Sequence, residues 1–165
     1  MTAEERSVYR YLAEKRICYR LARHHRVSAI KDCVVSEALL GGLMPRNLFL
    51  QPRNGSSAFL FILHPESPFR TSHVSRQANS SRLSFGSEEA LKQMLHTHPG
   101  AVSPLGLIFE SAKDVSLLID RKLLAEKTLI FHPLENTASL RMDAETFFHG
   151  FLRSLQKNYL LIDTE

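Results

Sequence analysis

Residues 58–63 read Ala-Phe-Leu-Phe-Ile-Leu, an apolar run that leaves no polar side chain for either face of an extended chain. A strand of this kind needs cover on both faces, so we expect it to be central in its sheet. The turn sequence Pro-Arg-Asn-Gly at residues 52–55 precedes it, and residues 46–50 before that turn predict another strand. The two runs are therefore expected to pair as an antiparallel hairpin.

The remaining segments alternate between helical and extended patterns. Helices are predicted at residues 2–16, 29–40, 72–78, 88–95 and 120–126, with a last helix after Asp143 whose phenylalanines form an apolar stripe. Ser87 is the expected cap of the helix at 88–95, and Asp120 is expected to be a helix cap and not a catalytic carboxylate. Strands are predicted at residues 17–21, 82–85, 105–109, 115–119, 128–131, 137–141 and 159–162. Because short turns join several strand pairs, including 105–109 with 115–119, the predicted fold class is α/β (α+β) with a mixed, mostly antiparallel sheet.

A chain of 165 residues suits one domain, here residues 1–165, and neither a linker nor an internal repeat divides it. The net charge is +4 and the pI is about 9.3, with ten Lys or Arg against five Asp or Glu in residues 1–56. Arginines and histidines crowd residues 16–26. This region is either a patch for RNA phosphates or a solvated surface, and the sequence favours neither interpretation.

Several observations argue against other classes of protein. Cys18 and Cys33 have neither metal-type nor redox-type spacing, so we expect free, partly buried thiols in a reducing compartment. The N-terminus lacks a signal-peptide core and no apolar run is long enough to span a bilayer, which predicts a cytoplasmic protein. His96 and His98 lack a third ligand at a diagnostic spacing, so no metal or other cofactor is expected.

The small-residue loop at residues 100–104, Gly-Ala-Val-Ser-Pro, is the main candidate for a site. Gly100 permits backbone angles that a side chain disfavours, and Pro104 biases Ser103 toward an extended geometry. The amides of Ala101, Val102 and Ser103 are then able to point into a shared concavity, where they would stabilise an oxyanion or a phosphate. The alternative interpretation is that Gly100 and Pro104 only shape a turn.

Four segments together resemble a known family. These are Arg-Asn-Leu-Phe-Leu at 46–50, Leu-Ser-Phe at 83–85, Gly-Ala-Val-Ser-Pro-Leu at 100–105 and Phe-His-Pro-Leu-Glu-Asn-Thr-Ala at 131–138. In this order and spacing they resemble the YbaK/ProX family, the aminoacyl-tRNA-synthetase-associated or prolyl-tRNA editing domain, and most closely its free-standing ProX branch. The resemblance runs from about residue 4 to the C-terminus. It implies a partly curled mixed sheet surrounded by helices, with no metal.

The resemblance also implies an activity. Proteins of this family hydrolyse the ester that joins a wrong amino acid to the 3′ adenosine of a tRNA, and for the ProX branch the usual substrate is alanine on proline tRNA. The expected partners are therefore the 3′ acceptor end of a tRNA and prolyl-tRNA synthetase. Neither a membrane nor DNA is an expected partner.

The same resemblance gives roles to individual residues. The amides of Gly100–Ser103 are expected to be the catalytic oxyanion donors, while the ribose hydroxyl of the tRNA orients the attacking water. His132 is expected to line the amino-acid pocket, where it limits the size of the side chain or helps to place the substrate, and Pro104 is an expected substrate-binding residue. Asn47 and Asn136 match family positions and are expected to hydrogen-bond the adenosine or the loop, although turn and strand-end roles explain them equally well.

One position departs from the family pattern. The strand usually begins Lys-Asn-Leu-Phe, and the lysine is the side chain most closely linked to catalysis, but this chain has Arg46 there, after Pro45. Arginine keeps the charge and grips phosphate with two hydrogen bonds, yet its planar fork is not interchangeable with an ammonium group. Three outcomes stay open: retained activity, an altered substrate, or lost chemistry with RNA binding kept. The last describes a module that binds tRNA or a synthetase, and a hydrolase or sensor for a free amino-acid derivative is a third hypothesis.

Overall fold

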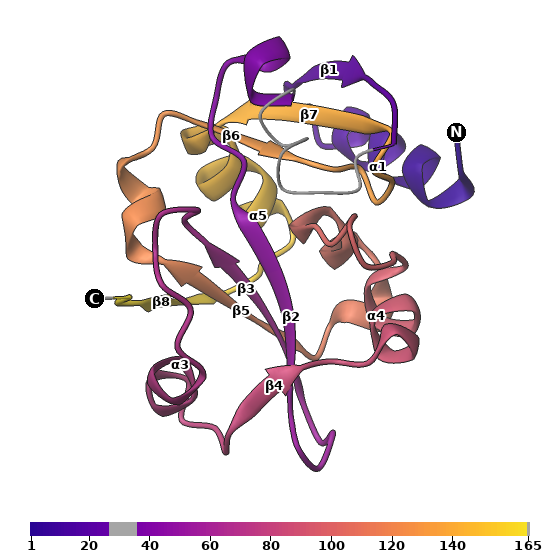
Figure 1. The fold of residues 1–165 in the computed structure, drawn as a ribbon. Helices are drawn as coiled ribbons and strands as arrows, with labels where there is room; N and C mark the ends of the chain where they lie inside the picture. Colours follow the sequence, from indigo (N-terminus) through magenta and orange to yellow (C-terminus); the bar gives the residue numbers. More distant parts are fainter. Residues whose placement is uncertain (27–35, 165) are drawn as a thin grey trace.

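The computed structural model describes residues 1–26 and 36–164, and within them the strands form two sheets (Figure 1). The larger sheet has the strand order β4-β2-β3-β5-β8 and the smaller one β1-β7-β6. The larger sheet comprises β4 (Leu83–Phe85), β2 (Arg46–Pro52), β3 (Ala58–Leu63), β5 (Val115–Asp120) and β8 (Tyr159–Ile162). The smaller comprises β1 (Arg20–Arg23), β7 (Ala138–Asp143) and β6 (Thr128–Phe131).

The apolar run at 58–63 is central in the larger sheet, as predicted. β3 pairs antiparallel with β2 and parallel with β5, and all six of its residues are buried. Leu60 and Ile62 join a large hydrophobic cluster on one face, while Phe59 and Phe61 join a smaller cluster on the other. The predicted hairpin of residues 46–50 and 58–63 is therefore confirmed, and it separates two apolar layers.

The helices cover these layers. They are α1 (Ala3–Glu14), α3 (Thr71–Gln77), α4 (Glu88–Leu95) and a C-terminal π-helical turn (Thr146–Phe151) that continues into α5 (Leu152–Ser154). Figure 1 shows the smaller sheet above the larger one with the C-terminal turns between them, and α3 beside β4. Phe147 and Phe151 of those turns pack in the large cluster with residues of both sheets.

Local signals explain where several helices begin and end. The Ser87 hydroxyl accepts a hydrogen bond from the Ala90 amide at 3.1 Å, the cap that the sequence predicted for α4. Of the helix predicted at 29–40, residues 36–40 are helical and Gly41 follows with φ +66°, whereas residues 27–35, with Cys33, lie outside the described residues. Cys18 is a free thiol but is exposed, not partly buried as expected.

The predicted strand at 105–109 is wrong, and with it the hairpin to 115–119. Residues Pro104–Ile108 form a 3-10 helix, because the Ser103 hydroxyl accepts a hydrogen bond from the Leu105 amide at 3.2 Å and Pro104 starts the helix. Gly106 packs so closely that an added Cβ would lie 2.6 Å from the Leu95 carbonyl oxygen. β5 consequently pairs parallel with β3 and β8, although four of the six strand pairings in the described chain are antiparallel.

Two further predictions need adjustment. One mixed sheet was expected, but the strands divide into two sheets that share a core. The strand predicted at 17–21 begins three residues later, as β1, because Ile17 turns back on α1 through a 2.8 Å hydrogen bond from its amide to the Leu12 carbonyl. Ile17 is buried there in the large cluster.

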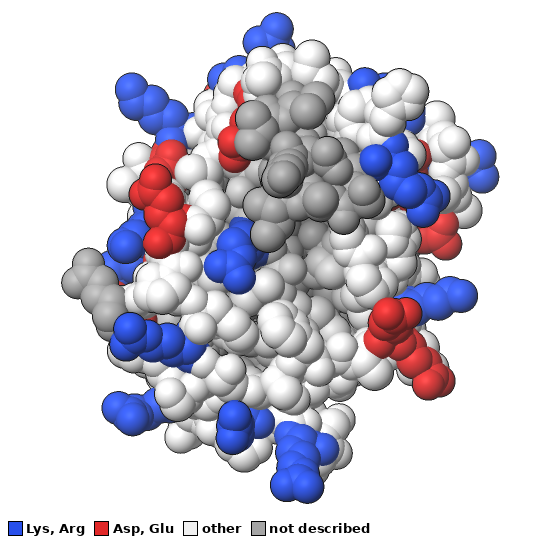
Figure 2. Space-filling view, viewed as in Figure 1, with Lys and Arg blue, Asp and Glu red and all other residues white. Residues whose placement is uncertain are grey.

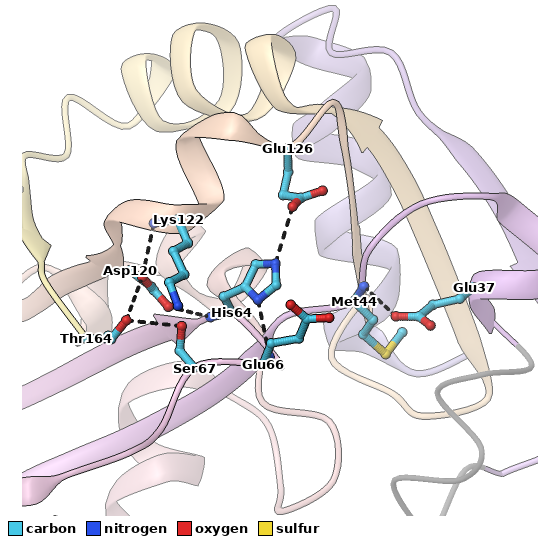
Figure 3. Close-up of polar contacts among 9 residues, drawn as sticks. All are labelled: Glu37, Met44, His64, Glu66, Ser67, Asp120, Lys122, Glu126 and Thr164. Atoms are coloured by element: carbon cyan, nitrogen blue, oxygen red, sulfur yellow. Dashed lines mark hydrogen bonds and ion pairs between the residues drawn. The ribbon is translucent and has the colours of Figure 1, made fainter.

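A buried polar cluster joins the carboxyl ends of the parallel strands (Figure 3). Asp120, at the end of β5, is fully buried and accepts hydrogen bonds from the amides of His64 at 3.1 Å and Lys122 at 3.0 Å. The Thr164 hydroxyl donates to the same carboxylate at 3.2 Å. The bond from Lys122 makes Asp120 the cap of the following 3-10 helix (Arg121–Ala125), the structural role expected from the sequence.

Asp120→Asn is therefore expected to lower the free energy of unfolding by about 1–3 kcal/mol, because the amide nitrogen would oppose a main-chain donor in a buried place. Urea denaturation measures the change. The matched control is Asp163→Asn on the surface, whose ion pair with Arg121 is exposed and should contribute little. Equal stability of the Asp120 variant and the parent would contradict this assignment.

Candidate active site

The two loops that carry the sequence motifs lie against each other. The buried Thr97 hydroxyl is 3.0 Å from the Ala101 carbonyl oxygen and 3.2 Å from the Leu134 carbonyl oxygen, so its hydrogen bond links the Gly100 loop (residues 97–104) to the His132 turn (residues 132–137). His98 Nε2 lies 3.6 Å from Glu135 Oε2 across the same boundary. Motifs more than 30 residues apart in the chain thus form one local structure.

Within the Gly100 loop, the geometry narrows the set of predicted amide donors. Gly100 is exposed with φ +89°, a conformation that favours glycine. The Ala101 amide already donates to the His98 carbonyl at 3.1 Å, and Ser103 is fully buried with its hydroxyl capping the next helix. The amides of Gly100, Val102 and Ser103 donate to no other described residue, but Ser103 is fully buried, so the amides of Gly100 and Val102 are the candidate donors for a ligand.

Pro104, expected to be a substrate-binding residue, is buried as the first residue of the 3-10 helix. Asn136 lies next to Gly100, because an ideal Cβ on Gly100 would be 3.6 Å from Asn136 Nδ2. The structure therefore brings Asn136 to the exposed end of the Gly100 loop. The side chain of Asn136 is largely buried there.

His132 is a buried imidazole with a defined tautomer. Its Nδ1 lies 2.8 Å from the Ala138 carbonyl oxygen, an acceptor only, so Nδ1 carries the hydrogen and Nε2 keeps its lone pair. Burial lowers the pKa of His132 from its ordinary value of 6.5, the nearby His24 and His98 lower it further, and the bond to Ala138 opposes them. The ring is therefore neutral at pH 7.

Behind His132 lies a polar network that the sequence interpretation missed. The Ser139 hydroxyl is 3.3 Å from His132 Nδ1, 2.8 Å from His24 Nε2 and 3.0 Å from the Ser36 hydroxyl. The His24 and His132 rings meet edge to face with centroids 6.0 Å apart. The sequence signal for this network was Ser139, a polar residue between the apolar Ala138 and Leu140. All three are buried, and a buried hydroxyl needs a hydrogen-bond partner.

The depressed pKa of His132 predicts a pH dependence. The unfolded chain binds a proton at His132 more readily than the folded chain, so the free energy of unfolding should fall as pH drops below 6.5, until the folded imidazole also protonates. Urea denaturation at pH 7.5 and 5.5 should show a larger loss for the parent than for His132→Gln. An imidazole NMR titration of His132 with a midpoint at or above 6.5 would contradict the assignment.

Arg46 and Asn47 begin β2 on opposite faces of the sheet. Asn47 pairs with Ile62, whose cluster contains Leu105 and Leu134 of the two loops, whereas Arg46 pairs with Leu63 of the other cluster. Asn47 Oδ1 is buried and has no hydrogen-bond partner among the described residues. Asn47 thus shares the face of the loops, and the register does not bring Arg46 onto that face.

The exposed Arg46 forms no ion pair with any residue that the structure describes.

His96 and His98, the two histidines considered for a metal, contact different side chains. The His96 ring stacks on Phe109 with centroids 4.0 Å apart, while His98 faces Glu135. No group of three His, Cys, Asp or Glu side chains suited to a metal occurs in the described part of the chain. Nor does that part contain a helix long and apolar enough to cross a bilayer.

Comparison with known proteins identifies the family. The sequence model of the aminoacyl-tRNA editing domain matches residues 25–148, and the chain belongs to this family. Prolyl-tRNA editing protein ProX of Acetoanaerobium sticklandii is 26% identical over 141 residues, which are 86% of each protein. Prolyl-tRNA synthetase associated domain-containing protein 1 of Danio rerio is 25% identical over 119 residues, 71% of this chain and 64% of that protein.

Solved structures share the fold at lower identity. A protein proposed as a trans-editing enzyme for prolyl tRNA synthetase has a TM-score of 0.75 over 100% of this chain and 99% of its own, at 13% identity. The hypothetical protein APE2540 has a TM-score of 0.71 over 94% and 97%, at 14% identity. The predicted α/β class and the family resemblance are confirmed.

Proposed function

We propose that the chain is a trans-editing deacylase that hydrolyses the ester of a mischarged tRNA, with alanine on proline tRNA as its substrate. The family and the name of the ProX relative support this class of substrate. The observation that carries the proposal is the buried Thr97 hydroxyl, which joins the Gly100 loop to the His132 turn in one site. The proposed enzyme is one domain over residues 1–165 that acts in the cytoplasm with tRNA and prolyl-tRNA synthetase as partners.

Ester hydrolysis needs a water, an acceptor for its proton and donors for the developing oxyanion. The amides of Gly100 and Val102 supply the donors, since the Ala101 amide is engaged in the turn. The ribose hydroxyl of the tRNA orients the water, so no side-chain nucleophile is required. The neutral His132 offers the lone pair of Nε2 to the amino group of the substrate and limits the volume of the pocket.

The two asparagines, Asn47 and Asn136, are proposed to contact the adenosine end of the substrate and the loop beside it. Asn47 Oδ1 is a buried acceptor without a described partner, on the face of the sheet that carries both loops, which suits the amino group of a base or a ribose hydroxyl. Asn136 lies beside Gly100 and positions the loop against the ester.

The test is a panel of mischarged tRNAs incubated with the purified protein. Alanine should be released from proline tRNA, and correctly charged proline tRNA should be spared. Absence of release from every mischarged tRNA would reject the proposal. Activity on an aminoacyl-adenosine mimic that does not increase when the full tRNA is attached would favour a hydrolase for free amino-acid derivatives.

A second function, a tRNA-binding module without turnover, is favoured by Arg46 in the position of the family lysine. In that case Arg46→Lys should create deacylase activity that the parent lacks, while tRNA affinity stays similar because both side chains carry one charge. Single-turnover deacylation and a tRNA titration measure the two effects. A parent that already works at enzyme-like rates, with no gain in the lysine variant, would exclude the binding-module function.

A further inference from the structure

The stretch between Glu37 and Glu88 has a strong excess of positive charge. It contains one acidic residue, Glu66, and five arginines: Arg46, Arg53, Arg70, Arg76 and Arg82. None of these arginines forms an ion pair with a described residue. Figure 2 shows basic side chains along the lower edge of the molecule, over α3, β4 and the turn between β2 and β3. Unpaired guanidinium groups of this kind are available to an anionic partner.

Two of these arginines line a groove between α3 and β4. The groove has a volume of about 650 Å³, and Arg76 and Arg82 share its lining with four hydroxyl side chains, those of Thr71, Ser72, Ser75 and Ser80. The exposed Arg76 lies on α3, and the exposed Arg82 directly precedes β4. The lining therefore contains hydrogen-bond donors and positive charge, and no acidic side chain.

The shape of the groove is fixed by the one buried hydroxyl. Ser75 donates to the Thr71 carbonyl at 2.6 Å and accepts from the Leu83 amide at 2.9 Å, which ties α3 to β4. The hydroxyls of Thr71, Ser72 and Ser80 donate to no residue in the described ranges, so they remain free for a ligand. Arginine forks combined with free hydroxyls suit the oxygens of phosphate groups.

An exposed aromatic ring lies on the same side of the sheet. Phe85, the last residue of β4, is 66% exposed, and its ring centroid is 5.8 Å from that of Phe69. Phe85 pairs with Leu50, whose cluster also contains Val74 of α3, so its side chain projects on the α3 face. Large exposed aromatics beside arginines are typical of surfaces on which unpaired RNA bases stack.

We propose that the α3–β4 surface, made of Arg76, Arg82, Phe85 and the free hydroxyls of the groove, binds the tRNA away from the ester. Phosphates occupy the groove and a base stacks on Phe85. Arg46 begins β2 on the same face, so this surface extends toward the family lysine position. The proposal rests on the tRNA substrate proposed above. It places much of the positive charge available to RNA on one surface, although the net charge of the chain is only +4.

The experiment measures binding of uncharged proline tRNA at several salt concentrations. Arg76→Gln/Arg82→Gln should bind about tenfold more weakly at 0.1 M salt, and the slope of log K against log salt should decrease in magnitude by about 1.5, as expected for two lost phosphate contacts. Phe85→Ala should weaken binding about fivefold with an unchanged slope, because stacking carries no charge.

The matched control is Lys92→Gln/Arg153→Gln, which removes two exposed charges from α4 and α5. It should leave affinity nearly unchanged. The proposal is overturned if the parent binds no tRNA, if the Arg76/Arg82 variant binds like the parent, or if both double variants weaken binding equally. Because the tRNA is uncharged, a parent that binds tRNA but never deacylates it rejects only the proposed function. The substituted residues are exposed, and thermal unfolding verifies that the variants fold.

Discussion

Gly100→Val is expected to lower kcat/KM for deacylation at least about 100-fold while the protein stays folded. The φ of Gly100 is +89°, which a β-branched residue adopts only with strain. Space is not the cause, because an added Cβ meets nothing nearer than Asn136 Nδ2 at 3.6 Å. The main chain must instead rotate, and this moves the amides of Gly100 and Val102 away from the oxyanion; loss of one such donor typically costs 10²–10³ in rate.

The control for this substitution is Gly55→Val. Gly55 also has a positive φ, +65°, and an added Cβ there would meet nothing within 4 Å, but it lies in the β2–β3 turn. Both variants carry a similar backbone strain, so Gly55→Val should be destabilised comparably and remain active. Full activity of Gly100→Val in single-turnover assays would show that the loop only shapes a turn.

Thr97→Val should have the second largest effect. The substitution keeps the shape of the side chain but leaves the carbonyls of Ala101 and Leu134 without their buried donor. The expected cost is about 1–3 kcal/mol in the free energy of unfolding. Activity should also fall about tenfold or more, because the Gly100 loop and the His132 turn lose their connection and small displacements of a reacting group are costly.

Thr97→Ser is the matched control, since it retains the hydroxyl and should restore most of the activity and stability. Urea denaturation and single-turnover kinetics, performed where all variants are folded, separate the two effects. If Thr97→Val were destabilised but catalysed normally, the connection between the loops would be structural and not part of the active site.

The sequence predicted those parts of the fold that depend on local signals. The apolar run at 58–63, the turn before it and the Ser87 cap each determine their own structure, so the hairpin and α4 were predicted correctly. The segment 105–109 was predicted wrongly, because a short apolar run fits a strand or a buried helix equally well and the Ser103–Pro104 cap before it was not recognised as a helix start. Its outcome depends on the contact between Gly106 and Leu95, which is tertiary.

The site itself stays a prediction. The motifs around Gly100 and His132 were expected to share one site, and in the structure the two loops lie against each other, but no signal in the sequence indicated that Thr97 connects them. The Ala101 amide was expected to be an oxyanion donor, but it donates to the His98 carbonyl in a turn, because of backbone angles that the sequence does not specify. The face on which Arg46 lies depends on strand register, which a sequence motif does not specify.

The most direct measurement is to titrate a non-hydrolysable alanyl-adenosine, with an amide in place of the ester, into the protein and to follow backbone and imidazole NMR signals. We expect saturable shifts at the amides of Gly100 and Val102 and at the His132 ring, with much smaller shifts in α3. Binding that perturbs other surfaces and leaves these three groups unchanged would contradict the proposal that the ester is cleaved between the Gly100 loop and the His132 turn.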